Sequence, residues 1–326
     1  MPTSGIMPTF RAVADFTIVI PVLNGAAYIE GAIRSVLRQD VSVQLIVADG
    51  GSTDGTIEVV RTFGDAVMLL PGPDAGQSDA INCGLRVADG TWFNWLGADD
   101  RLLPGALRKV LGTGSTADVV AGRCRHIDAT GRTVAVGGTV VQPTIEATMA
   151  HYSMGQPAHF YRTEKVVALN GPDPTLHYCM DMDLWFRYII QNELNKIIIL
   201  DGELAIFTLH RTSKSVAQSQ LMRAERYAVW KAVARSCGVQ DQLPELDERA
   251  SRIALDYPLP DTFNGKLFIG NVAWHLLLER YEAGDVHGMS RILPLVEEAM
   301  EFGPMEHLAW KLRKIKAALT IVEKTQ

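Results

Sequence analysis

The stretch "DFTIVIPVLNGAAYIEGAIRSVLRQDVSVQLIVADGGSTDGT", residues 15–56, decides the fold. Its apolar, β-branched run at 15–23 is stopped by Pro21 and "NG", which is typical of a buried strand followed by a loop. Residues 26–40 then carry apolar side chains at helical spacing, and residues 43–56 return to a strand that breaks at "DGGSTDGT". A strand, a helix and a strand in this order indicate a parallel sheet with right-handed crossovers.

The alternation continues with strands at 66–72 and 91–100 and a helix at 76–88 between them. The sequence therefore predicts an α/β fold with a mostly parallel, Rossmann-like sheet flanked by helices. In such sheets, ligands bind outside the carboxyl ends of the strands. Four loops lie at that edge, "PVLNG", "ADGGSTDGT", "PGPDAGQSDAIN" and "LGADD". Each is compatible with an ordinary turn, and it is their shared location that indicates a site.

Beyond residue 110 the elements alternate less regularly. We expect a strand pair at 118–141, a strand and a helix at 154–171, a helix at 181–192 and two short strands at 196–211. From about residue 216 onward, helical periodicity dominates. The predicted parts are a leader at 1–14, an α/β domain at 15–215 and a smaller C-terminal helical region at 216–326.

The composition is ordinary for a globular protein, with 47% hydrophobic and 21% charged residues in 326. A net charge of −6 with both signs mixed along the chain argues against a nucleic-acid partner. The four cysteines show no CxxC pairing, so neither a zinc site nor a disulfide framework is indicated, and a reducing compartment fits. No signal peptide and no run of about 20 apolar residues is present, which predicts a cytoplasmic protein without a transmembrane helix.

The strand at 91–100 ends in two adjacent carboxylates, Asp99 and Asp100. The aromatic and apolar residues before them predict a strand covered on both faces, so its end lies close to the core. Like charges there repel one another and lose solvation unless a cation or hydrogen-bond donors compensate. A divalent cation bound to the carboxylates is one way to compensate these costs. The ten residues alone leave a second interpretation open, in which Asp99 caps a following helix.

Six segments together resemble the inverting family 2 glycosyltransferases of GT-A fold: "TIVIPVLNGAAYIEGAIRSVLRQ", "LIVADGGSTDGT", "PDAGQSDAINCGL", "GTWFNWLGADDRLLPGAL", "QPAHFYR" and "MDMDLWFR". The resemblance spans residues 16 to about 215, with the motifs in the family's order. It implies transfer of a sugar from a UDP-, GDP- or dTDP-type donor to a hydroxyl group, with inversion. The implied acceptor is a saccharide or a lipid-linked acceptor in bacterial polysaccharide, lipopolysaccharide or glycolipid synthesis.

The resemblance also implies that Asp99 binds Mn²⁺ or Mg²⁺ together with the donor diphosphate, with Asp100 beside it. These cations prefer oxygen ligands and neutralise charge on the leaving group. The family more often has another aspartate at the position of Gly97, whereas Gly97 and Ala98 are neutral here. Ala98 is assigned to the donor site. Direct coordination by Asp100 and the strength of metal dependence stay open.

The first three loops supply the implied contacts to the nucleotide sugar. The candidate residues are Pro21, Asn24, Asp49, Gly50, Ser52, Asp79 and Asn82. Asp49 can accept a hydrogen bond from a base N–H, and glycine lets the backbone approach a ligand closely. Structural roles are also open, since Asn24 can stabilise its turn and Asp79 can support a helix N-terminus. For Asp54, capping of the helix at 57–63 is the preferred interpretation.

Inversion requires a base that deprotonates the acceptor hydroxyl. Asp181 in "MDMDLWFR" aligns with the aspartate of the family's Glu-Asp motif, so the resemblance implies that Asp181 is the general base. Met180 stands where the family has the glutamate. Met180 is placed on the acceptor side, together with Gln156 and Pro157 of "QPAHFYR".

The segment "FTLHRTSKS", residues 207–215, resembles the family's loop that closes over the diphosphate. His210 could complete the metal site, and Arg211 or Lys214 could neutralise phosphate charge. A purely structural role for His210 stays open.

Other functions and locations would require other features of the sequence. A nucleotidyltransferase would carry a basic, glycine-rich loop after the first strand, which "PVLNGAAYIEG" lacks. The alternative from another class is a catalytically inactive sugar-nucleotide-binding scaffold or sensor. The segment "HLAWKLRKIKAAL", 307–319, fits a helix lying on the inner face of a membrane. The preferred interpretation is a helix that packs on the α/β domain or on a second subunit of a homo-oligomer.

Overall fold

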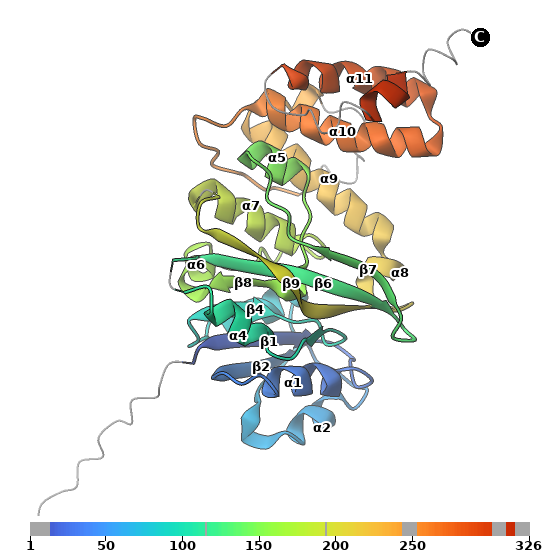
Figure 1. Cartoon of the computed structure of the whole chain (residues 1–326). Helices are drawn as coiled ribbons and strands as arrows, with labels where there is room; N and C mark the ends of the chain where they lie inside the picture. Colours follow the sequence, from blue (N-terminus) through green and yellow to red (C-terminus); the bar gives the residue numbers. More distant parts are fainter. Residues whose placement is uncertain (1–13, 115, 193, 243–252, 302–310, 317–326) are drawn as a thin grey trace, which may run out of the picture.

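The computed structural model in Figure 1 describes residues 14–301 and 311–316, apart from 115, 193 and 243–252. The predicted leader therefore lies outside the described residues except for Ala14. A central sheet is flanked by helices, and α10 (Gly265–Ala283) and α11 (Val286–Met300) lie at one end of the molecule (Figure 1).

Within the described residues, nine strands form one sheet in the order β3-β2-β1-β4-β8-β6-β9-β5, with β7 paired to β6. Their bounds are β1 (Phe16–Val22), β2 (Val43–Asp49), β3 (Met68–Pro71), β4 (Trp92–Trp95), β5 (Arg101–Leu102), β6 (Val119–Asp128), β7 (Thr133–Gly138), β8 (His159–Arg162) and β9 (Ile197–Leu209). The first four are parallel neighbours, and β6 is parallel to β9. The strands β8, β7 and β5 are antiparallel to their neighbours, so the sheet is mixed beyond β4.

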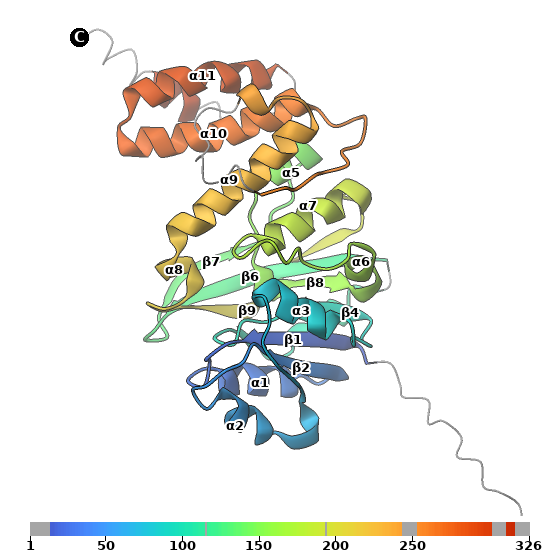
Figure 2. The ribbon, with the colours of Figure 1, turned by 180° about the vertical axis from the view of Figure 1, so that it is seen from behind.

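Helices cover both faces of the sheet. Their bounds are α1 (Ile29–Leu37), α2 (Thr56–Arg61), α3 (Gln77–Leu85), α4 (Ala106–Leu111), α5 (Ile145–Ala150), α6 (Thr163–Ala168), α7 (Met180–Asn192), α8 (Lys214–Ala217) and α9 (Ser219–Ser236). In Figure 1, α1 and α4 lie in front of the sheet. In Figure 2, seen from behind, α3, α6 and α7 lie in front. The predicted α/β class with flanking helices and a helical C-terminal region is confirmed.

The alternation of side chains along β1 explains these two layers. Ile18 and Ile20 are fully buried in the same cluster as Ile33 of α1, whereas Val19 belongs to the cluster on the opposite face. Successive residues of a strand point to opposite faces, so an apolar run is buried on both. On the second face a Cβ at Gly84 of α3 would lie 2.5 Å from the Val19 side chain, so a glycine lets α3 approach the sheet closely.

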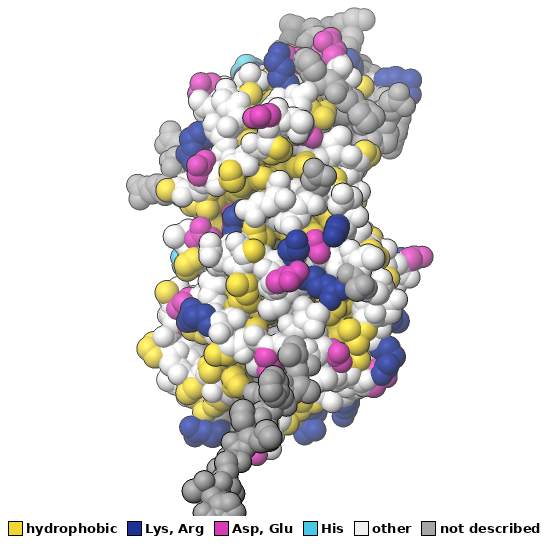
Figure 3. All heavy atoms as spheres, turned by 90° about the vertical axis from the view of Figure 1, so that its left-hand side faces the viewer, with side chains coloured by type: hydrophobic (Ala, Val, Ile, Leu, Met, Phe, Trp, Pro, Cys, Tyr) yellow, Lys and Arg dark blue, Asp and Glu magenta, His cyan; other side chains and the backbone are white. Residues whose placement is uncertain are grey.

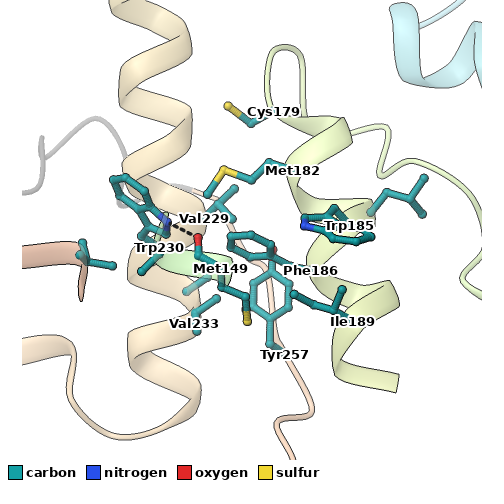
Figure 4. Packing of buried hydrophobic residues seen from close by; sticks show 14 of the residues in the cluster. Met149, Cys179, Met182, Trp185, Phe186, Ile189, Val229, Trp230, Val233 and Tyr257 are labelled. Atoms are coloured by element: carbon teal, nitrogen blue, oxygen red, sulfur yellow. Dashed lines mark hydrogen bonds between the residues drawn. The ribbon is translucent and has the colours of Figure 1, made fainter. Parts of the chain in front are cut away.

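The C-terminal helices share a hydrophobic core with α7. Figure 4 shows Phe186 of α7 facing Val229 and Val233 of α9, and Trp185 is buried in the same cluster. The indole Nε1 of Trp230 on α9 donates to the Met149 carbonyl at 3.1 Å, which ties α9 to α5. The predicted division at residue 215 falls inside α8 and stays a prediction.

The two short strands expected at 196–211 are wrong, because β9 is one strand of 13 residues. The "DG" at Asp201 and Gly202 suggested a turn. In the structure, Ala121 of β6 pairs with Ile199 and Arg123 pairs with Glu203. The pairing register between β6 and β9 therefore shifts at these residues, and β9 continues in the same direction.

The C-terminal segment 307–319 is described only at 311–316, which is helical. Leu312 and Ile315 are buried in the core shared with α10 and α11. Packing of this helix on the α/β domain or on a second subunit stays a prediction. No helix in the described part of the chain is long and apolar enough to cross a membrane. Figure 3 shows acidic and basic side chains interspersed over the described part of the face in view.

Candidate active site

A cavity of about 870 Å³ opens at the carboxyl ends of β1 and β4. One part of its wall is Pro21 and Asn24 after β1 and the 97–100 segment after β4. The opposite part includes the start of α7, with Met180 and Asp181. Residues of predicted donor loops and the predicted base, Asp181, therefore line the same cavity.

The two carboxylates after β4 converge over Gly97. A Cβ at Gly97 would lie 2.7 Å from Asp100 Oδ2 and 2.8 Å from Asp99 Oδ1, so a larger residue here would displace one of them. Glycine in place of a further aspartate therefore lets both carboxylates approach the same backbone. The helix-cap interpretation of Asp99 is wrong, because the next helix starts at Ala106, after Gly105, and β5 intervenes.

Asp100 is 3% exposed, and its Oδ1 accepts a hydrogen bond from Thr208 N–H at 3.0 Å. Burial and the neighbouring Asp99 charge raise the pKa of Asp100 well above its ordinary value. A cation bound beside the two carboxylates would offset both causes.

His210 meets Asp99 from the loop after β9. Its Nε2 lies 2.8 Å from Asp99 Oδ2, and its Nδ1 lies 2.9 Å from Thr212 Oγ1. The Tyr28 ring stacks on the imidazole at 4.7 Å between centroids. His210 is therefore held against the carboxylate pair by contacts on three sides.

The donor set fits a hard divalent cation that is also bound by substrate. Two carboxylates point to one place, and oxygen ligands suit Mg²⁺ and Mn²⁺. No group of three or more acidic, histidine or cysteine side chains with metal-site geometry occurs among the described residues. Asp99 and Asp100 would hold the cation, and donor phosphate oxygens would complete its coordination, as Mg²⁺ commonly requires.

Asp49 lies at the end of β2 and is 2% exposed. Its Oδ2 accepts hydrogen bonds from the N–H groups of Gly51 and Ser52, whereas its Oδ1 is buried and has no partner among the described residues. A buried acceptor without a partner is unfavourable unless a ligand donor meets it. A Cβ at Gly50 would lie 2.7 Å from Asp74 Oδ2, so Gly50 and Asp74 pack together beside this carboxylate.

Asn24 links the first two loops. It adopts a left-handed φ of 56°, its Oδ1 accepts from Thr53 N–H at 2.9 Å, and its own N–H donates to Ser52 Oγ at 2.8 Å. The turn-stabilising interpretation of Asn24 is thus supported, and Asn24 also lines the cavity.

The expected helix cap by Asp54 is wrong, because Gly55 holds the N-cap position of α2. Asp54 Oδ1 accepts from Thr56 N–H at 3.1 Å, and Oδ2 accepts from Ala26 N–H at 3.0 Å. The residue joins the same two loops as Asn24.

Six predicted site residues do not line the cavity: Asp49, Gly50, Ser52, Asp79, Asn82 and Arg211. Asp79 Oδ2 accepts from Ala75 N–H at 3.1 Å, and Asn82 Nδ2 donates to the Pro172 carbonyl at 2.8 Å. Arg211 is exposed. Their contacts are structural, and a role in sugar binding stays a prediction for them.

Lys214 lines the cavity near the donor loops. Its Nζ donates to Gln77 Oε1 at 2.9 Å, and burial lowers its pKa. On the acceptor side, Gln156 Nε2 donates to Asn94 Oδ1 at 3.0 Å and Asn94 Nδ2 donates to the Pro157 carbonyl at 3.0 Å, so this wall is tied to β4.

Asp181 is the second residue of α7 and lines the cavity. Its carboxylate accepts a hydrogen bond from Met182 N–H at 2.8 Å, and the Tyr152 hydroxyl acts on it to lower its pKa. Burial raises the pKa of Asp181, and the Tyr152 hydrogen bond opposes that rise. A carboxylate with a raised pKa that faces a cavity is suited to general-base chemistry.

The Tyr152→Phe variant is expected to lose more activity at acid pH than at alkaline pH. Removing the hydroxyl takes away a donor that favours the ionised base, so the pKa of Asp181 rises further. A base must be ionised, and the rate therefore falls as the pH drops through that raised pKa. When kcat is measured between pH 5 and 9, the fall in rate on the acid side should occur at a higher pH in the variant than in the wild type. A fall at the same pH in both proteins would contradict the proposed contact.

Glu225 of α9 holds the backbone immediately before α7. It is 7% exposed, and its carboxylate accepts hydrogen bonds from the N–H groups of His177, Tyr178 and Cys179 at 2.9, 2.6 and 2.5 Å. Negative charge at a helix start is also favourable. The C-terminal helical region thus fixes the segment that presents Asp181.

We expect Glu225→Ala to destabilise the protein by about 3–5 kcal/mol, because it leaves buried N–H donors without an acceptor. Urea unfolding of the purified variant measures this. Glu279→Ala is the matched control, since Glu279 accepts an exposed hydrogen bond from Tyr227 and should change stability by less than about 1 kcal/mol. Equal stability of the two variants would contradict the anchoring role.

Sequence reasoning missed several residues of this cavity. Tyr28, Asp74, Tyr152 and Arg226 line it, and Glu225 supports it from behind. Asp74 is the one with a local signal, because "PDAG" forms an Asx turn in which Asp74 Oδ1 accepts from Gly76 N–H at 2.9 Å.

The fold and the cavity together define a glycosyltransferase of GT-A fold. The chain is similar over its length to solved structures of S. aureus TarS 1-349. The complex with UDP has a TM-score of 0.55 at 17% identity and covers 93% of this chain and 87% of that chain. The complex with UDP-GlcNAc gives the same TM-score and identity and covers 93% and 88%. At this identity the likeness establishes the fold.

The sequence profile described as "Glycosyl transferase family 2" matches residues 17–181, about half of the chain, and the chain belongs to that family. The "PGL/p-HBAD biosynthesis glycosyltransferase" of Mycobacterium tuberculosis is 40% identical over 92 residues. That match covers 27% of this chain and 36% of the relative, so it spans about a third of the relative's length. The predicted family and the predicted enzyme class are confirmed.

Proposed function

We propose that this enzyme transfers one sugar from a nucleoside diphosphate sugar to a hydroxyl group of a saccharide or lipid-linked acceptor, with inversion. The observation that carries the proposal is the single cavity that joins the carboxylate pair after β4 to Asp181 at the start of α7. A displacement with inversion needs leaving-group stabilisation on one side of the anomeric carbon and a base on the other.

The donor occupies the part of the cavity lined by the loop after β1 and by Asp74, which packs against Gly50 at the end of β2. Asp49 Oδ1 accepts an N–H of the base, and the tight Gly50–Asp74 contact shapes the floor next to it. Lys214 lines the cavity, and its ammonium group would bind phosphate oxygens of the donor. A divalent cation bound by Asp99 and Asp100 would neutralise charge on the departing diphosphate.

Asp181 acts at the other end. Its carboxylate takes the proton of the acceptor hydroxyl while the acceptor oxygen forms a bond to the anomeric carbon. The bond between that carbon and the phosphate oxygen breaks in the same step, and its electron pair leaves with the diphosphate. Tyr152 holds the carboxylate oriented and ionised for this role.

A thermal-shift screen of UDP-, GDP- and dTDP-sugars, each with and without Mn²⁺, tests the donor part. We expect one nucleotide class to raise Tm by several degrees and Mn²⁺ to increase that shift, since ligands that bind only the folded state stabilise it. No stabilisation by any of these donors would count against the proposal. Stabilisation without sugar release in any assay would instead favour the sugar-nucleotide sensor.

A further inference from the structure

Arg226 on α9 brings a cation into the same cavity as Asp181. Its Nε is buried and has no hydrogen-bond partner among the described residues. The guanidinium keeps its charge at any physiological pH, so it cannot relieve this by losing a proton. Arg226 as a whole is partly exposed, and an acceptor for its buried Nε would come from outside the described protein groups.

The carboxylates near Arg226 are already engaged. Glu225, the preceding residue, accepts from three backbone N–H groups before α7. Asp181 accepts from Met182 and Tyr152. Among the described residues no hydrogen bond or ion pair joins Arg226 to Asp181, although the Arg226 charge lowers the pKa of Asp181. Neither carboxylate therefore neutralises the guanidinium by direct contact.

The surroundings of Arg226 separate it from the donor diphosphate. The cavity wall near it carries Met222 one helical turn earlier on α9 and Cys179 and Met180 before Asp181. Lys214 begins α8, and its Nζ donates to Gln77 Oε1 of α3 at 2.9 Å and to the His177 carbonyl at 3.4 Å. Lys214 is thus engaged by protein acceptors, whereas Arg226 Nε has no acceptor among the described residues.

We propose that Arg226 binds an anionic group, a carboxylate or a phosphate, on the acceptor, close to the hydroxyl that Asp181 deprotonates. This rests on the proposed function and adds the substrate class. Guanidinium binds either anion through two parallel N–H···O bonds, which suits recognition of a planar carboxylate or a phosphate. The neighbouring Met180 and Met222 supply apolar contact for the rest of the acceptor.

The test uses full-length protein saturated with the nucleoside diphosphate and Mn²⁺ that give the largest thermal shift. Calorimetric titrations compare glucuronate with glucose, and glycerol 3-phosphate with glycerol. The two arms distinguish an acidic sugar from a phosphate-bearing acceptor. The variants are Arg226→Met, and Arg223→Met as control, since Arg223 lies on the same helix, is exposed and does not line the cavity.

We expect wild type and Arg223→Met to bind at least one anion about 10-fold or more tightly than its neutral counterpart, and Arg226→Met to lose that preference. Equal affinity for charged and neutral ligands in the wild type would overturn the inference. So would an anion preference that survives in Arg226→Met. If no nucleoside diphosphate binds, the donor part of the proposed function fails, and the same titrations on the free protein still decide the role of Arg226.

Discussion

Asp181→Asn is expected to lower kcat for sugar transfer by about 10²–10⁴-fold, the usual contribution of a general base. Asparagine retains an oxygen that can accept from Tyr152 and Met182 but takes up no proton from the acceptor hydroxyl. The fold should survive, because burial already disfavours the ionised carboxylate at this position. Nucleotide binding and Tm should therefore stay close to the wild-type values while turnover is lost.

Asp183→Asn is the matched control on the same helix. Asp183 is buried, but its carboxylate contacts Arg187 at 2.6 Å and accepts from the Tyr257 hydroxyl at 2.8 Å, away from the cavity lining. This variant should lower Tm and retain kcat. If Asp181→Asn kept full turnover, Asp181 would not be the base.

Asp99→Asn is expected to remove the effect of Mn²⁺ on donor binding and to lower kcat/KM by about 10²–10³-fold. An amide is a poorer ligand for a hard cation than a carboxylate, and charge stabilisation of the leaving group contributes several kcal/mol. Titrations of the donor nucleotide with and without Mn²⁺ measure the first effect, and initial rates measure the second.

Asp201→Asn controls for the loss of one surface charge. Its carboxylate is 95% exposed and pairs with Arg123 on the sheet surface. This variant should bind nucleotide and metal like the wild type. A metal response of Asp99→Asn equal to that of the wild type would rule Asp99 out as a ligand.

The donor half of the site could be predicted because its residues follow strands in local sequence patterns. The apolar run of β1 and the loops after β1, β2 and β4 fix where Asn24, Asp49 and Asp99 lie. The hydrogen-bond partners of these residues could not be predicted from the local sequence patterns. For Asp54 the sequence favours a helix cap, and for Asn24 it leaves nucleotide contact and turn stabilisation open, yet both residues bond across to the neighbouring loop.

The acceptor half could be predicted only in part, because Gln156, Pro157, Met180 and Asp181 lie in recognisable motifs whereas Tyr152 and Arg226 do not. Tyr152, Asp181 and Arg226 come from separate elements and meet only through the packing of α9 on α7. Glu225 and Arg226 lie on α9, beyond the region of family resemblance, where a helical pattern gives no sign of which polar residue points inward. Gly97 departs from the family's pattern, which more often has an aspartate at this position. The close approach of Asp99 and Asp100 accounts for the glycine.

The anomeric configuration of the sugar first released from the donor tests the central claim most directly. Water can replace the unknown acceptor, so real-time proton NMR of donor hydrolysis requires only the stabilising nucleotide sugar, Mn²⁺ and enzyme. An α-linked donor should give the β-anomer of the free sugar before mutarotation, and Asp181→Asn should abolish its release. First release of the α-anomer would contradict direct displacement with Asp181 as the base.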